Sequence, residues 1–271
     1  MTTNVPTHDG SQVLRTGLPA IAGAVAALLL FLVYLFIGSR IKNEPDAKES
    51  RISPAVLYLA RVGQDPINAL SFSAFGAGLA ILLVRRRNLS VHESALREGW
   101  LPNDEGLLIL PDDALEMRKR LRAAAPGTDQ LYPIRILSAA LMRTRAVWSA
   151  ADAGDAVKTQ GEIVSGEIEA EYGLVRYLAW AIPSIGFIGT VYGLGNAIGE
   201  FKKDNATDAM KGAVEFMFTA FDTTMIGLIL SLVLMAAFYL IQAREDALVV
   251  RATEWCLRGF VFRMHPDEKV A

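Results

Sequence analysis

The sequence has one cysteine, Cys256, and three histidines, His8, His92 and His265. A single cysteine excludes a disulfide within the chain and a cysteine-based metal site. The histidines lie outside the long apolar stretches, so the commonest metal ligand is missing from those stretches. Charge is nearly balanced, with 27 basic and 29 acidic residues, which indicates no surface for nucleic acid. We expect neither a metal nor a cofactor.

Apolar residues, in contrast, make up 52% of the chain and occur in clusters. A helix needs about 20 mostly apolar residues to cross the hydrocarbon of a bilayer. Four stretches are long enough, at 18–38, 66–84, 177–199 and 216–243. The first is too long for a signal peptide and is followed by no small-residue cleavage site, so we expect a retained helix. The predicted fold class is an all-α membrane protein with four transmembrane helices.

The segments outside these four stretches are polar. Basic residues near the helix ends, above all Arg85, Arg86 and Arg87, favour a cytoplasmic location for both termini. In this orientation we expect a flexible N-terminal tail at 1–17, an extracytoplasmic loop at 39–65 and a cytoplasmic helical segment at 85–176. We expect a second extracytoplasmic loop at 200–215 and a cytoplasmic C-terminal helix at 244–271.

Three helices are predicted in the cytoplasmic parts. The run Pro111-Asp112-Asp113, followed by ALEMRKRLRAAA, predicts a helix with acids early and bases late, ended by Pro126-Gly127. Gly and Pro are sparse between Pro133 and Tyr172, which predicts a long helix that runs directly into the third span. The pattern in QAREDALVVRATEWCLRGFVF predicts that the fourth span continues as a helix beyond the bilayer.

The third span is rich in small residues, namely Gly186, Gly189, Gly193, Gly195 and Gly199. Glycines four residues apart let helix backbones approach closely where lipid offers no hydrophobic drive for association. Pro183 removes one backbone donor and is expected to bend the helix. Tight packing in a helix bundle would by itself explain the glycines.

The polar residues of the spans are mostly hydroxyls. Thr219, Asp222, Thr223 and Thr224 lie within two turns of the fourth span, and Thr190 lies on the third. Threonine hydroxyls in membrane helices often bond to carbonyls of their own helix, and the Asp222 carboxylate can reach the membrane–water interface. Neither kind of group therefore requires a functional role. Counted along antiparallel spans, however, Thr190 and Thr224 both fall in the outer half. We therefore expect these two hydroxyls to face a common pathway.

Two motifs make the sequence recognisable. The third span, AIPSIGFIGTVYGLGNAIGEF, resembles the Pro-x-x-Gly-x-x-Gly-Thr-x-x-Gly signature of the MotA/TolQ/ExbB proton channel family. The fourth, FTAFDTTMIGLILSL, resembles the second pore helix of that family, with Thr224, Gly227 and Leu228 in its Thr-x-x-Gly-Leu segment. The resemblance covers roughly residues 140–260. The two extra spans before it are more similar to MotA than to the three-span TolQ and ExbB.

The resemblance implies a ring of five copies in the inner membrane of a bacterial cell. The ring would surround two copies of a single-span partner similar to MotB, TolR or ExbD, which supplies a membrane aspartate. Proton flow would drive rotation or force on the cell envelope, with no enzymatic activity. Thr190 and Thr224 match the pore-lining threonines, and Thr219, Asp222 and Thr223 are further candidates. TolQ and ExbB have a glutamate near the position of Thr219, where this chain offers Asp222 as the nearby acid.

Other functions fit less well. An intramembrane protease would need a histidine or a second aspartate within the spans. A small-molecule transporter would usually show paired repeats with broken helices. A non-conducting oligomeric scaffold, which anchors a cytoplasmic helical assembly, explains the glycines and the long helices and stays open as an alternative. Sodium in place of protons also stays open.

Overall fold

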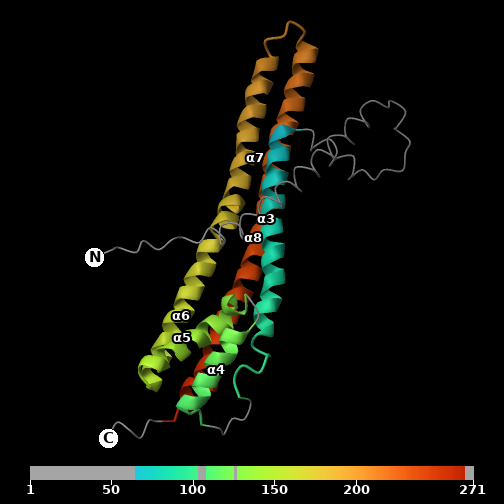
Figure 1. Ribbon diagram of the computed structural model, residues 1–271. Coiled ribbons are helices and arrows are strands. Elements are labelled where there is room, and N and C mark those ends of the chain that lie inside the picture. The colour runs from blue at the N-terminus through green and yellow to red at the C-terminus, as the bar shows by residue number, and fades with distance from the viewer. Residues whose placement is uncertain (1–64, 103–107, 125–126, 266–271) are drawn as a thin grey trace, which may run out of the picture. The chain divides into compact units, whose positions relative to one another are not determined.

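The computed structural model describes residues 65–102, 108–124 and 127–265 (Figure 1). The elements in these ranges are helices, apart from an isolated bridge between Ile109 and Met264. The all-α class is therefore confirmed for the described part of the chain. The expected tail at 1–17 and first transmembrane helix at 18–38 lie outside the described residues, as does the loop at 39–65 except for its last residue.

Six α-helices and two short 3-10 helices form the described part. They are α3 (Pro66–Ser94), α4 (Pro111–Ala123), η2 (Thr128–Gln130), α5 (Tyr132–Ala146), α6 (Ala150–Glu171), α7 (Gly173–Glu200), α8 (Ala206–Gly259) and η3 (Val261–Arg263). Among the described residues, three helical stretches are long and apolar enough to cross a membrane, namely Pro66–Ser94, Ala150–Glu200 and Ala206–Arg263. They contain the apolar stretches at 66–84, 177–199 and 216–243.

The chain divides into two compact units. The first, here called the membrane unit, comprises, among the described residues, 65–84 and 173–239 and contains all of α7. The second, here called the peripheral unit, comprises residues 85–172 and 240–271 and contains α4, α5 and α6. Both α3 and α8 contribute to each unit.

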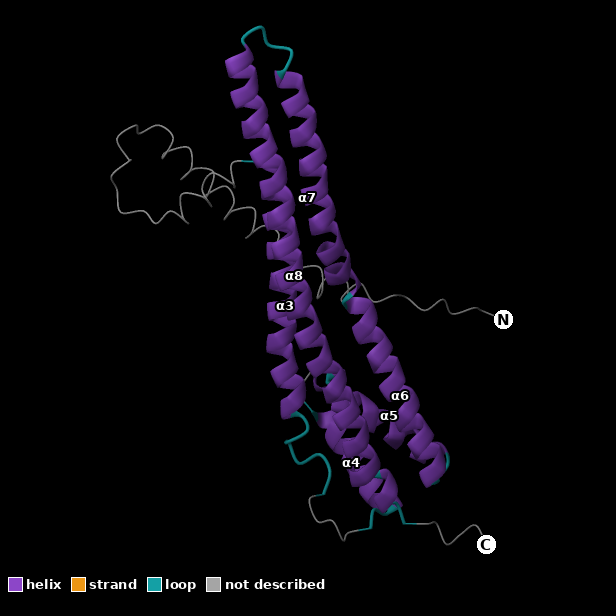
Figure 2. Cartoon of the chain, turned by 180° about the vertical axis from the view of Figure 1, so that it is seen from behind, coloured by secondary structure: helices purple, strands orange, loops and turns teal. Residues whose placement is uncertain are grey.

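In the membrane unit, α7 and the first part of α8 form a helical hairpin, joined by residues 201–205 (Figures 1 and 2). The buried face of α7 repeats every three or four residues, as in Ala179, Ile182, Gly186 and Gly189. Its other face exposes large apolar side chains, including Trp180, Phe187 and Ile188. A helix that is apolar all round is expected where lipid or other membrane helices cover the outer face.

The peripheral unit has an apolar core of its own. Buried positions on α6 recur with helical spacing, as in Val157, Val164 and Ile168, and face buried residues such as Leu137 of α5. Gly161 of α6 adjoins the side chain of Thr253 on α8, so these two helices approach closely there. The packing between these helices therefore resembles that in the core of a water-soluble helical domain.

Local sequence signals explain most helix ends. The acids-early helix is confirmed as α4, where the Asp113 carboxylate accepts the backbone N–H of Leu110 at 2.9 Å. The continuation of the fourth span is also confirmed, since α8 runs without a break to Gly259. The single helix expected from Pro133 to Tyr172 is wrong, because α5 ends at Ala146. Ser149 then caps α6 by accepting the N–H of Asp152 at 3.3 Å.

Candidate ion pathway between α7 and α8

The two helices of the hairpin approach closely because glycines line their contact. A methyl group on Gly186 would lie 2.8 Å from the carbonyl oxygen of Thr223, and one on Gly193 would lie 2.7 Å from the Cβ of Ala220. On α8, Gly227 faces the backbone of α7 in the same way. Backbones this close allow a short hydroxyl side chain of one helix to reach a carbonyl of the other.

Thr190 and Thr224 meet at this contact. Their hydroxyl oxygens form a hydrogen bond in which either can donate. The Thr190 hydroxyl also lies 3.0 Å from the carbonyl oxygen of Ala220, and the Thr224 hydroxyl lies 3.1 Å from that of Gly186. Each of the two hydroxyl hydrogens thus has two possible acceptors, a backbone carbonyl and the oxygen of the other hydroxyl. The donor roles can therefore exchange while the heavy atoms stay in place, as a relay of protons requires.

Thr223 lies beside this pair and is 1% exposed. Its hydroxyl donates to the carbonyl of Ala220, one turn earlier, at 2.9 Å, and lies 3.3 Å from the carbonyl oxygen of Gly186. A methyl group on Gly189 would collide with its side chain. Thr223 therefore fills the space that Gly189 leaves, and its hydroxyl hydrogen is donated to a backbone carbonyl inside the hairpin.

The remaining predicted residues lie elsewhere on the hairpin. Thr219 donates to the carbonyl of Glu215 on its own helix at 3.2 Å, so it does not join the threonine pair. Asp222 is half-buried on α8, two residues before Thr224. Gly195 and Gly199 have open space where a Cβ would stand and take no part in the contact between α7 and α8.

The residue that sequence reasoning missed is Ser231. Its hydroxyl donates across the hairpin to the carbonyl of Ala179 at 2.7 Å. In a regular helix that carbonyl would accept the backbone N–H four residues later, which is at Pro183 and is missing. The sequence does signal, through Pro183, that the Ala179 carbonyl needs another donor, but it does not show which residue supplies one.

A second polar cluster lies in the peripheral unit around Glu245, which is 4% exposed. Tyr132 and Tyr172 each donate a hydroxyl hydrogen bond to its carboxylate at 2.6 Å. The guanidinium of Arg85 contacts the same carboxylate at 3.1 and 3.2 Å and also pairs with Glu171. Burial, followed by the charge of Glu245, raises the pKa of Tyr132 well above its usual value. Its hydroxyl therefore stays protonated and remains a donor.

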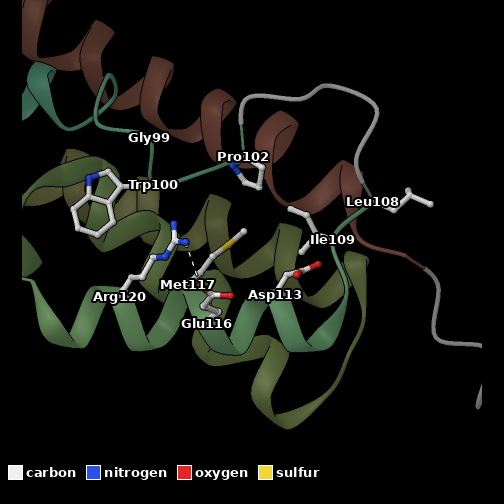
Figure 3. A pocket seen from close by; sticks show the side chains of 9 residues that line it. All are labelled: Gly99, Trp100, Pro102, Leu108, Ile109, Asp113, Glu116, Met117 and Arg120. Carbon is white, nitrogen blue, oxygen red and sulfur yellow. Dashed lines mark hydrogen bonds and ion pairs between the residues drawn. The ribbon is translucent and has the colours of Figure 1, made fainter.

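A surface cavity of about 240 Å³ also lies in the peripheral unit. Figure 3 shows Glu116 and Arg120 beside it, paired at 3.1 Å, with Met117 between them on α4. Its lining residues lie between 99 and 120, outside the segment that carries the two motifs, and none of them was predicted as a site residue.

The long apolar helices, two of which meet through neutral hydroxyls, define a helical membrane protein. Residues 133–254 match the model of the MotA/TolQ/ExbB proton channel family, which confirms the recognition made from the two motifs. Both threonines of the pair, and Ser231, lie within the match. No curated protein sequence and no solved structure is significantly similar to the chain.

Proposed function

We propose that this chain is the ring-forming subunit of a proton-driven membrane motor, in which Thr190 and Thr224 pass protons along the contact of α7 and α8. The supporting observation is the hydrogen bond between these two hydroxyls, inside the segment that matches a proton channel family. Each hydroxyl can give one hydrogen and accept another, which is what transfer to and from a nearby carboxylate needs.

The carboxylate that exchanges the protons would come from a partner. We propose five copies of this chain around two copies of a single-span subunit with a membrane aspartate, in a bacterial inner membrane and with both termini in the cytoplasm. The exposed apolar faces of α7 and α8 support such an assembly, because a ring and its central helices would cover them. Asp222, half-buried on α8 two residues before Thr224, is proposed as an additional acidic group on the pathway.

The deciding experiment measures proton flux in liposomes that contain the chain with a co-expressed single-span partner. We expect Thr190→Val and Thr224→Val each to lower the flux at least about tenfold, which corresponds to about 1.4 kcal/mol on the barrier, with the copy number unchanged. Thr224→Ser should retain flux because it keeps the hydroxyl. Ser184→Ala is the matched control, since Ser184 donates to the Trp180 carbonyl of its own helix at 3.1 Å.

Native mass spectrometry of the gently solubilised complex tests the assembly. Five copies with two of the partner would support the motor, whereas a monomer, or a ring without a partner, would contradict it. If the wild-type ring with its partner conducts no protons, the chain is better explained as the non-conducting scaffold, for which the glycine contacts suffice. Normal flux in the threonine variants of a conducting ring would instead refute the role of Thr190 and Thr224.

A further inference from the structure

We infer that Ser231 is a positioning residue for the threonine pair, and that its hydroxyl replaces the backbone donor that Pro183 lacks. The link to conduction rests on the proposed function. The hydrogen bond to Ala179 does not, and the two parts can be tested separately.

The first step is the fate of the Ala179 carbonyl. Ala179 is 1% exposed, so the surrounding helices shield it from bulk water as an alternative donor. Because Pro183 has no N–H, this carbonyl would be left without its regular partner, and an unsatisfied carbonyl in hydrocarbon is costly. Ser231 supplies the missing hydrogen bond at 2.7 Å from the neighbouring helix.

The second step concerns which carbonyl accepts the hydrogen bond of the Ser231 hydroxyl. A serine in a membrane helix commonly donates to the carbonyl three or four residues earlier in its own helix. Ser184, one residue after Pro183, does so with Trp180. Ser231 instead donates across the hairpin, to the one carbonyl of α7 that the proline frees. The donor and the freed acceptor therefore form a matched pair.

The third step is the position of this bond relative to the pathway. Ser231 follows Thr224 by seven residues, about two turns, and so lies on the same face of α8. Gly227, between them, lies against the Ile182 carbonyl, where an added Cβ would stand 3.1 Å away. The bond thus holds the proline turn of α7 against α8 two turns from the pair. A helix bends most easily where it lacks a backbone hydrogen bond, so this tie restrains the bend of α7 at Pro183 and with it the approach of Thr190 to Thr224.

A double-mutant cycle tests the hydrogen bond without any measurement of flux. Ser231→Ala should lower the ratio of folded to unfolded protein in the solubilised complex roughly threefold, the average for one hydrogen bond between membrane helices. In a Pro183→Ala background the Ala179 carbonyl regains a backbone donor, so Ser231→Ala should change the ratio little. Equal shifts in the two backgrounds would overturn the inference.

If Pro183→Ala fails to assemble, Ser231→Thr and Ser231→Val provide the same test. The two introduced side chains have nearly the same shape and differ by one hydroxyl. Ser231→Thr should therefore keep the wild-type ratio of folded to unfolded protein, and Ser231→Val should lower it. Equal values for the two would again overturn the inference.

Proton flux then tests the positioning role. We expect Ser231→Ala to lower flux several-fold with the copy number unchanged, Ser231→Thr to restore it, and Ser184→Ala to leave it unchanged. Normal flux in Ser231→Ala, alongside loss in Thr190→Val, would refute the positioning role and leave the proposed function standing. Normal flux in Thr190→Val would instead refute the proposed function, while the cycle would still decide the hydrogen bond.

Discussion

The two units of this chain join their helices by different chemistry. In the membrane unit, α7 and α8 meet through glycines and through neutral hydroxyls that donate to backbone carbonyls. In the peripheral unit, the helices meet through an apolar core and a buried carboxylate that binds one arginine and two tyrosines. A charge is costly in hydrocarbon unless it is paired or reaches water, whereas a hydroxyl that finds a carbonyl is not.

This difference separates a part that can rearrange from a part that holds its shape. Hydrogen bonds between membrane helices contribute about 0.6 kcal/mol each on average, so exchanging one for another costs little. Removing one partner of a buried ion pair costs several times more, because the other charge is left buried and unpaired. The proposed motor would need both properties, hydroxyls that can exchange partners and a helical unit that keeps its own packing.

The most damaging substitution should fall in the peripheral unit. Glu245→Ala leaves two tyrosine hydroxyls without their acceptor and removes one of the two carboxylate partners of Arg85, so we expect a loss of about 3–5 kcal/mol in the free energy of unfolding. Denaturant titration of the solubilised protein measures it. Glu254→Ala, which breaks the exposed pair with Arg258 on the same helix, is the control and should change little. Equal effects of the two variants would contradict the comparison between the units.

A smaller loss is expected when a single donor of that cluster is removed. Tyr132→Phe deletes one hydrogen bond to a charged acceptor and should cost about 1.5–3 kcal/mol at pH 7. Because the pKa of Tyr132 is raised in the folded chain, its contribution is complete below the unfolded value of about 10 and is lost as pH rises above it. The difference between wild type and variant should therefore shrink at alkaline pH. A difference that stays constant from pH 7 to 11 would count against a neutral donor.

The sequence revealed the membrane class and the two family motifs, because both depend on residues close together in the chain. Apolar length identifies α7 and α8, and the order of Pro183, Gly186 and Thr190 identifies the family. The Glu245 cluster could not be predicted in this way, since Tyr132 lies 113 residues from Glu245. The break at Ser149 was missed because composition outweighed a single N-cap residue, although serine at such a position is a recognisable signal.

In the membrane unit, a substitution that overfills the contact between α7 and α8 should lower stability more than the loss of any one hydroxyl. Gly189→Ala would place a methyl group into the Thr223 side chain, and overpacking of this kind typically costs about 1–3 kcal/mol. Gly195→Ala on the same helix meets open space within the chain and is the control. Thermal unfolding of the solubilised chain compares the two. If both are tolerated, the close approach of α7 and α8 does not depend on Gly189.

The smallest effect is expected at Thr219, and it sharpens the comparison within the membrane unit. Its hydroxyl donates to the Glu215 carbonyl of its own helix and does not tie α8 to α7. Thr219→Val should therefore change the free energy of unfolding by less than about 0.5 kcal/mol, as is usual away from such ties. Proton flux should change less than about twofold, against at least about tenfold for Thr224→Val. A large flux loss in Thr219→Val with stability unchanged would place Thr219 on the pathway, and transfer would then extend beyond the hydroxyls that join the two helices.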